Sequence, residues 1–241
     1  MKRFLSQLRT ELSLMLRNGE QLLLTLGIPV MLLVFFSLVD VLPTDTKNPV
    51  DFLAPGVLAL AVMSTSMVSL GIGTGFERSY HVLKRLGATP LGRPRLVLAK
   101  VLSVAVVELI QFAVLVPVAY ALGWSPSSPR WLAAIGAVLL GTCAFAGIGL
   151  TLAGRLRGEI NLAAQNGLYL VLLLLGGMVV PFGKLPGPIR AVAHALPSGA
   201  LADTLRDALA HAGTQPSTSW WVLLGWAVVT PAVAARFFRW D

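Results

Sequence analysis

The stretch QLLLTLGIPVMLLVFFSLV, residues 21–39, contains no charged side chain. A helix that crosses the hydrocarbon core of a bilayer needs about 20 consecutive, predominantly apolar residues. Comparable stretches recur along the chain, so the sequence predicts an all-α, polytopic membrane protein in which residues 1–241 form a single transmembrane domain. The six predicted transmembrane helices cover residues 21–39, 52–76, 96–122, 131–154, 160–180 and 220–235.

The composition favours a protein that is embedded in lipid. Hydrophobic residues make up 56% of the 241 residues and charged residues only 12%, whereas soluble domains carry about 25% charged residues. The formal net charge of +8 therefore reflects the segments between the apolar stretches. A basic nucleic-acid-binding protein would instead carry its cations on a generally polar surface, so the composition argues against that class.

Residues 1–18 predict an amphipathic helix that lies in the membrane interface. Phe4, Leu8 and Leu12 recur at helical spacing, and basic residues fall largely elsewhere. A basic helix of this kind in front of a span is typical of an interfacial segment, although a solvated leader would share the pattern. Charged side chains such as Glu11 interrupt what would be the apolar core of a signal peptide, so we expect the segment to be retained.

The distribution of basic residues predicts the orientation of the chain. Of the 19 lysines and arginines, all but five fall on the side of the membrane that holds both chain ends. The five exceptions are Lys47, Arg130, Lys184, Arg190 and Arg206. Because lysine and arginine accumulate in cytoplasmic loops, the sequence predicts that the N and C termini are cytoplasmic.

The sequence lacks the usual motifs of catalysis and of metal binding. No lysine is followed by Ser or Thr, so the phosphate-binding Gly-x-x-x-x-Gly-Lys-Ser/Thr loop is absent. Cys143 is the single cysteine and the three histidines lie far apart, so we expect no metal site. We therefore predict no catalytic residues and no enzyme activity, and any ATP-driven work would need a separate subunit.

Two polar side chains lie near the middle of the third predicted span. Glu108 and Gln111 are at membrane depth, where a carboxylate costs about 2.5–3.5 kcal/mol and must face protein or water. Glu108 lines a substrate path or meets a polar partner there, with Gln111 one turn away, or it is a protonated or hydrogen-bonded packing residue of the bundle. The sequence leaves both interpretations open. Lys100, which is nearer the cytoplasmic end of the span, is expected to extend to the lipid headgroups.

The segments on either side of the spans carry further signals. Gly71 and Gly75 lie one turn apart and predict a close contact between helices. Residues 77–95 predict a cytoplasmic loop with a short helix that ends at Pro90. This loop is placed to dock on a cytoplasmic protein, and binding to anionic lipid is the alternative. Residues 181–212, too long for an idle connector, predict short helices that dip into the outer leaflet as a plug or lid.

Three motifs resemble those of a known family by their order and spacing. They are ER at 77–78 with KRLGATPL at 84–91, PFGKLP at 181–186, and ALP at 195–197. With these motifs nearly the whole chain is similar to the membrane subunit of the type-2 ATP-binding-cassette export permeases. That family includes daunorubicin-resistance-like drug exporters and polysaccharide or lipid exporters.

The resemblance implies a multi-pass permease of the bacterial plasma (inner) membrane. It would work as a homodimer, or as a heterodimer with a similar permease, above a pair of ATPase subunits that bind ATP and Mg. In this family the in-plane helix and the loop after the second span contact the ATPases. The residues that would lie at this coupling surface are Glu77, Arg78, Lys84, Arg85, Arg9 and Arg17. The chain departs from its relatives at Ser79-Tyr80-His81-Val82, where they often have acidic and Gly-Thr residues.

The leading functional hypothesis is therefore an export permease. It would move a hydrophobic or amphipathic substrate (a drug, an antibiotic or a lipid) out of the cell while a partner subunit hydrolyses ATP. The alternatives are an ATP-independent channel or carrier and a membrane scaffold that transports nothing. A channel or carrier would be expected to repeat polar residues along several spans.

Overall fold

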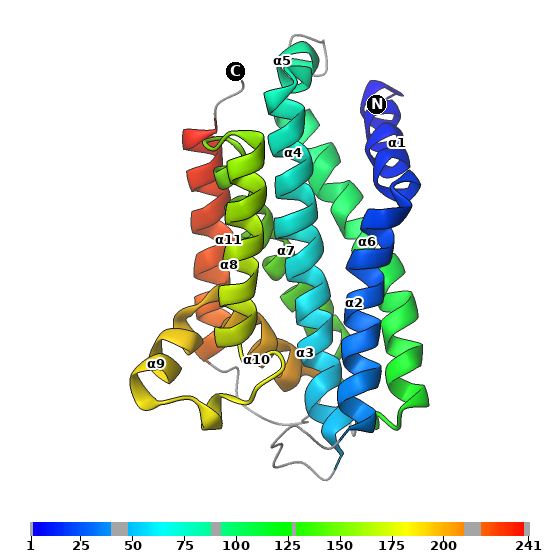
Figure 1. Ribbon diagram of the computed structural model, residues 1–241, viewed down its shortest axis with the longest axis vertical. Helices are drawn as coiled ribbons and strands as arrows, with labels where there is room; N and C mark the ends of the chain where they lie inside the picture. The colour runs from blue at the N-terminus through cyan, green and yellow to red at the C-terminus, as the bar shows by residue number, and fades with distance from the viewer. Residues whose placement is uncertain (1, 40–47, 88–92, 127–128, 210–217, 239–241) are drawn as a thin grey trace.

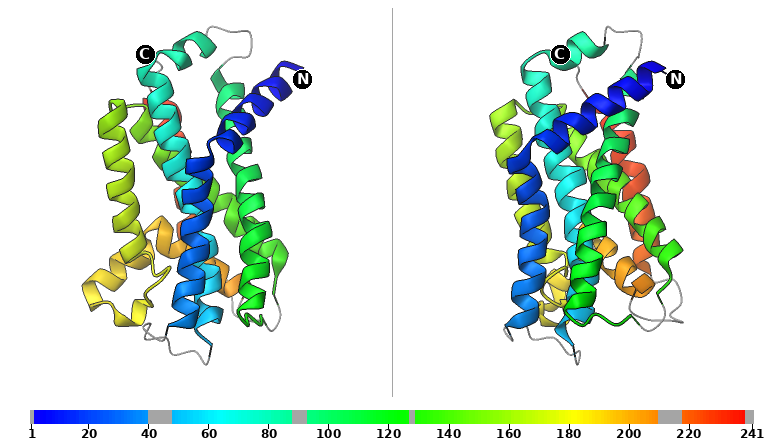
Figure 2. Two further views of the ribbon diagram at one scale, coloured as in Figure 1. Left: turned by 45° about the vertical axis from the view of Figure 1, so that its right-hand side comes forward. Right: turned by 90° about the vertical axis from the view of Figure 1, so that its right-hand side faces the viewer.

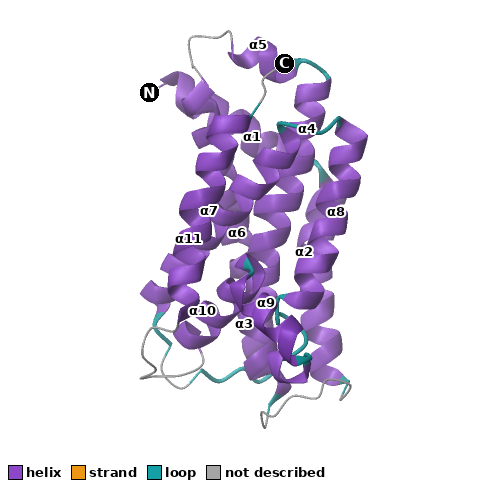
Figure 3. Ribbon diagram, turned by 90° about the vertical axis from the view of Figure 1, so that its left-hand side faces the viewer, coloured by secondary structure: helices purple, strands orange, loops and turns teal. Residues whose placement is uncertain are grey.

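A computed structural model describes residues 2–39, 48–87, 93–126, 129–209 and 218–238. This part of the chain is built from helices and contains no strand (Figure 3), so the predicted all-α class is confirmed. In chain order the elements are α1 (Lys2–Arg17), α2 (Gly19–Leu38), α3 (Pro49–Met63), the π-helical η1 (Ser64–Ser69), α4 (Leu70–Ser79), α5 (Val82–Gly87), α6 (Arg93–Ala121), α7 (Trp131–Ala153), α8 (Gly158–Leu175), the short 3-10 helix η2 (Phe182–Lys184), α9 (Gly187–Ala195), α10 (Pro197–Leu209) and α11 (Thr218–Phe237).

Five helices in the described part are long and apolar enough to cross a membrane. They cover Pro49–Ser79, Arg95–Ala121, Trp131–Ala153, Gly158–Leu175 and Thr218–Phe237. The first predicted span coincides with α2, where the described side chains form the shorter apolar helix Thr25–Leu38. The chain is therefore a multi-pass membrane protein, and the total of six spans stays a prediction.

The helix Pro49–Ser79 lies at the centre of the bundle (Figure 1). Of the most apolar 18-residue stretch of this helix, 89% is buried inside the protein, whereas the corresponding share for α8 is 22%. Leu53, Leu60 and Met63 are completely buried. In lipid such helices associate through close van der Waals packing and hydrogen bonds, so the central helix is the one on which the others are assembled.

The contact between α4 and α8 depends on two glycines. A Cβ atom at Gly71 would lie 2.1 Å from Gln165 Nε2, and one at Gly75 would lie 2.3 Å from Asn161 Nδ2. These amides use the space, because Asn161 Nδ2 donates to the carbonyl of Gly71 (2.9 Å) and Gln165 Nε2 to that of Gly149 (2.9 Å). The predicted close contact at Gly71 and Gly75 is confirmed, and its partner is α8.

The helix α8 ends at Leu175, earlier than the predicted end of the fifth span at residue 180. Gly176 follows as its C-cap, and Gly177 has a φ of +62°. Glycine adopts this left-handed conformation without a Cβ clash and commonly ends helices. The helix therefore ends before the apolar sequence does, and the chain stays in the core, where Met178 is completely buried.

The two ends of the bundle carry different elements. The helices α1 and α5 and the end of α11 lie at one end, and α9 and α10 lie at the other (Figure 1). The helix α1 runs obliquely across one end of the bundle and does not continue the direction of α2 (Figure 2). We call these the α1 end and the α10 end.

The predicted outer segment, residues 181–212, contains the three short helices η2, α9 and α10 up to Leu209, and residues 210–212 lie outside the described residues. Most of α9 is exposed, whereas α10 packs against α3, α7 and α11. Leu201 and Leu205 are at most 1% exposed. The helix α10 of the predicted outer segment therefore forms part of the core at the α10 end.

Candidate functional site

Three charged side chains form a buried cluster at the α1 end. Lys100 Nζ of α6 lies 2.9 Å from Glu11 Oε2 of α1 and 2.7 Å from Glu77 Oε2 of α4. Gln7 Nε2 donates to the second oxygen of Glu11 (2.7 Å). The Lys100 residue is only 4% exposed. This charge cluster therefore links α1, α4 and α6.

The prediction that Lys100 extends to the lipid headgroups is wrong. Its ammonium group stays inside because α1 and α4 each bring a carboxylate to it. Glu77, which the resemblance places at a coupling surface, faces Lys100 in this interior. Separating buried partners of opposite charge leaves an uncompensated charge and costs about 3–5 kcal/mol, so the cluster resists relative movement of the three helices.

Arg78 is also directed inward, where it fixes the end of α4. Its Nη1 donates to the carbonyl of Gly154 (2.9 Å) and its Nη2 to that of Leu156 (2.8 Å). Carbonyls at the end of a helix have no partner within the helix, and Arg78 supplies one to the end of α7. Ser79 Oγ accepts a hydrogen bond from the backbone of Gly158 (3.0 Å). The end of α4 is thereby attached to the turn between α7 and α8.

The other four cations of the predicted coupling surface are exposed. Lys84 and Arg85 lie on α5, and Arg9 and Arg17 lie on α1. Both helices are at the α1 end (Figure 2). Residues 88–92 of the predicted loop lie outside the described residues. The structure thus divides the predicted coupling residues into an exposed group of four and an inward pair, Glu77 and Arg78.

In the middle of α6, Gln111 connects three helices. Its Nε2 donates to the carbonyl of Thr25 in α2 (2.9 Å), and its Oε1 accepts from Thr65 Oγ1 (3.0 Å). Thr65 belongs to the π-helical segment η1 of the central helix. Such segments are frequent at functional sites. Gln111 is 2% exposed, so its amide holds the three helices together.

Glu108, one turn earlier on α6, has one satisfied oxygen and one free oxygen. Thr142 Oγ1 of α7 donates to its Oε2 (2.7 Å). Its Oε1 is buried and has no hydrogen-bond partner among the described residues. The side chain borders a cavity of about 400 Å³ between α6, α7 and α10. Of the two predicted path residues, Glu108 lines this cavity and Gln111 does not.

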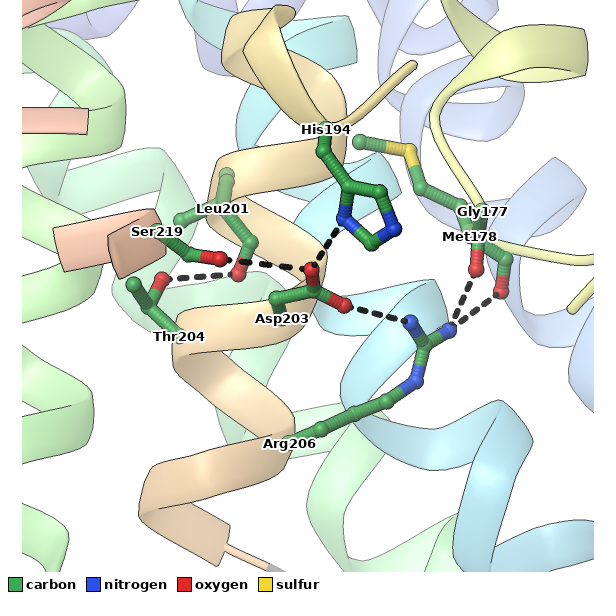
Figure 4. A network of polar contacts seen from close by, with 8 residues as sticks. All are labelled: Gly177, Met178, His194, Leu201, Asp203, Thr204, Arg206 and Ser219. Carbon is green, nitrogen blue, oxygen red and sulfur yellow. Dashed lines mark hydrogen bonds and ion pairs between the residues drawn. The ribbon is translucent and has the colours of Figure 1, made fainter. Parts of the chain in front are cut away.

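At the α10 end a polar network holds the outer segment (Figure 4). Arg206 of α10 donates to the carbonyl of Gly177 (2.5 Å) and pairs with Asp203 (3.7 Å). Asp203 also lies 3.2 Å from His194 Nδ1 and accepts from Ser219 Oγ (3.3 Å). Burial raises the pKa of Asp203 and lowers the pKa of Arg206 to about 10, and the attraction between the two opposes both shifts. The network joins α9, α10, α11 and the segment after α8.

Sequence reasoning missed several of these residues, above all Glu11 and Thr142. A contact such as that of Glu11 with Lys100, 89 positions apart in the chain, leaves no local pattern. One signal was available, because a charged residue within a predicted span requires a partner. Applied to Lys100, this rule would have pointed to acidic residues at the same membrane depth, and Glu77 is one of them.

Comparisons with known proteins agree with this architecture. The sequence model of a family described as "ABC-2 type transporter" matches residues 3–209. A protein of Bacillus subtilis (strain 168) with the name "Putative transport permease YvfS" is similar to this chain. The two are 28% identical over 194 residues, which cover 78% of this chain and 78% of the relative.

Proposed function

Because this chain belongs to the ABC-2 type transporter family, we propose that it is the transmembrane permease subunit of an ATP-driven exporter. Family membership supports the broader statement that it is a membrane transport permease. The proposal adds that transport is outward, that a partner hydrolyses ATP, and that the substrate is a hydrophobic or amphipathic molecule such as a drug, an antibiotic or a lipid.

The charge cluster at the α1 end carries the proposal. It joins α1, which exposes Arg9 and Arg17, and α4, which leads into α5 with Lys84 and Arg85, to the same ammonium group on α6. A protein docked on α1 and α5 would therefore act on α6 through contacts that cannot separate without leaving a buried charge unpaired. Such contiguous, rigid contacts are suited to carry a conformational signal.

We further propose six spans with both chain ends in the cytoplasm of a bacterial cell, in its plasma (inner) membrane. The exposed cations of α1 and α5 gather at the α1 end, where the described end of α11 also lies. Basic residues are retained on the cytoplasmic side, which supports this orientation. In this proposal α2 is the span that is added to the five long apolar helices, and it is the first span along the chain.

The proposed partners are ATPase subunits, which would bind ATP and Mg, and a second permease that is either a copy or a homologue of this chain. The exposed cations suit a docking surface on the ATPase that carries acidic groups, because complementary charge speeds and orients association. This division of labour leaves the ATP chemistry to the partner and the membrane path to this chain.

The test is a double charge reversal, Lys84→Glu with Arg85→Glu, in the permease purified together with a candidate partner ATPase. We expect stimulation of ATP hydrolysis by the permease, and export of an amphipathic dye from proteoliposomes, to fall several-fold. Glu77 is unsuitable for this test, because its reversal would place two like charges in the buried cluster. The exposed cations avoid that problem.

The matched control is Lys184→Glu, which reverses an exposed cation at the α10 end. It should leave both ATP hydrolysis and export unchanged. Wild-type hydrolysis in the double variant would contradict the docking surface. A complex in which the permease never changes the hydrolysis rate of the ATPase would contradict ATP-driven export itself.

A further inference from the structure

The cavity beside Glu108 combines apolar walls with one buried acidic group. Its volume of about 400 Å³ falls within the roughly 300–1,000 Å³ of small-molecule sites. The walls include Leu58, Ala105, Ala134 and Leu205. Among all its lining residues Glu108 is the one with an ionisable side chain.

The free oxygen of Glu108 requires a partner that the described residues do not provide. A buried carboxylate is stable only when a counter-charge or hydrogen-bond donors compensate for its lost hydration. Thr142 satisfies Oε2, but Oε1 has no partner in the described part of the chain. Without such compensation the carboxyl group keeps its proton, and an apolar occupant would fit the walls beside it. A cation in the cavity would supply the counter-charge that stabilises the ionised form.

The aromatic residues of the cavity favour the same class of ligand. Phe112 and Trp131 both line it, and the faces of aromatic rings attract cations. The side chains that reach the molecular surface are apolar: Leu109 is 66% exposed, and Ile135 and Leu139 are each 55% exposed. These residues belong to the spans α6 and α7, so this surface faces lipid. A ligand would therefore enter from the membrane.

We propose that this cavity binds a lipophilic cation, such as an amphipathic amine dissolved in the membrane, with the Glu108 carboxylate as its counter-charge. The position of Glu108 near the middle of α6 favours a free amphiphile over the amino headgroup of a bilayer lipid, which stays at the membrane surface. The inference deepens the proposed function by naming a substrate class, and it rests on that function only for the transport step.

The test measures equilibrium binding of radiolabelled tetraphenylphosphonium to the purified full chain in phosphatidylcholine nanodiscs, without ATPase or nucleotide. We expect saturable binding that Glu108→Gln weakens by roughly tenfold or more, because this substitution keeps the shape and removes the charge. Glu159→Gln is the matched control, since it makes the same change at an exposed carboxylate outside the cavity. It should bind like the wild type.

Two further measurements test the cavity and the sign of the charge. Ala134→Phe fills the cavity and should abolish saturable binding, with gel filtration used to confirm that the variant is folded. Radiolabelled tetraphenylborate, which has the same shape and the opposite charge, should show no saturable binding in a separate sample. Wild-type affinity in Glu108→Gln, or saturable binding of tetraphenylborate as tight as that of the cation, would overturn the proposal.

Nanodiscs that contain phosphatidylethanolamine distinguish the source of the cation. Unchanged binding supports a free amphiphile, and loss of binding would overturn that part of the proposal in favour of a lipid headgroup. The double variant Lys84→Glu, Arg85→Glu should bind the cation normally. In the wild type, saturable cation binding without any coupling to the ATPase would count against the proposed function alone, and ATPase coupling without saturable cation binding would count against this inference alone.

Discussion

Replacing Lys100 with methionine tests the charge cluster most directly. The substitution keeps most of the side-chain volume and removes the positive charge between Glu11 and Glu77. Breaking a buried ion pair costs about 3–5 kcal/mol, because the remaining charge loses its compensation. The side chain of Glu77 remains 22% exposed and Glu11 keeps its hydrogen bond from Gln7. We therefore expect Lys100→Met to lower the free energy of unfolding by an amount within this range, and not by the sum for two ion pairs.

The assay is thermal unfolding of the purified chain in detergent or nanodiscs. For chains of about 150–250 residues, a loss of 1 kcal/mol lowers the melting temperature by about 2–4 °C. Lys100→Met should therefore lower the melting temperature by about 6–20 °C. The loss should be visible without ATPase or substrate, because the cluster lies within the chain.

A triple variant separates the loss of compensation from the loss of the side chain itself. Glu11→Gln and Glu77→Gln, added to Lys100→Met, remove all three charges. Because the triple variant leaves no uncompensated charge in the cluster, it should regain most of the loss. A single variant as stable as the wild type, or a triple variant no better than the single one, would refute the reasoning.

Three further predictions follow from contacts elsewhere in the bundle. Gly71→Ala should destabilise the chain by about 1–3 kcal/mol, because the new methyl group would lie 2.1 Å from Gln165 Nε2. Gly73→Ala, whose methyl group would have nothing within 4 Å, should melt at or slightly above the wild-type temperature, because helices favour alanine over glycine. Arg206→Ala removes the donor to the carbonyl of Gly177 and should speed proteolysis between α8 and α9; an unchanged cleavage rate would contradict the role of the network. Arg78→Ala frees the carbonyls at the end of α7 and should raise hydrogen exchange in the turn between α7 and α8, as measured by mass spectrometry.

The membrane architecture could be predicted because lipid imposes a local rule on the sequence. Each span must satisfy its own backbone groups and carry apolar side chains, so every candidate span appears as a continuous stretch. The close contact at Gly71 and Gly75 was accessible for a similar reason, since two small residues one turn apart have few other uses in a membrane helix. The helix end at Leu175 was missed because the apolar sequence continues past the glycines that stop the helix.

The candidate site was less predictable, because its contacts join residues that are distant in the chain. Charge alone suggested that Lys100 would reach toward water, whereas the oblique path of α1 brings Glu11 to it. Glu108 and Gln111 share a span and looked equivalent in the sequence. The tertiary packing distinguishes them: Thr25 and Thr65 satisfy Gln111, and Thr142 satisfies only one oxygen of Glu108.

The burial of the helix Pro49–Ser79 determines how the surrounding bilayer acts on the protein. A thinner or thicker bilayer changes the tilt of the helices that it touches, and the central helix touches almost none of it. Its depth in the membrane is set by neighbouring side chains, whereas α8 responds to lipid directly. A change in bilayer thickness should therefore shift α8 relative to α4 and α7, to which the Asn161 and Gln165 amides bind. These two contacts are where a change of lipid composition would strain the fold.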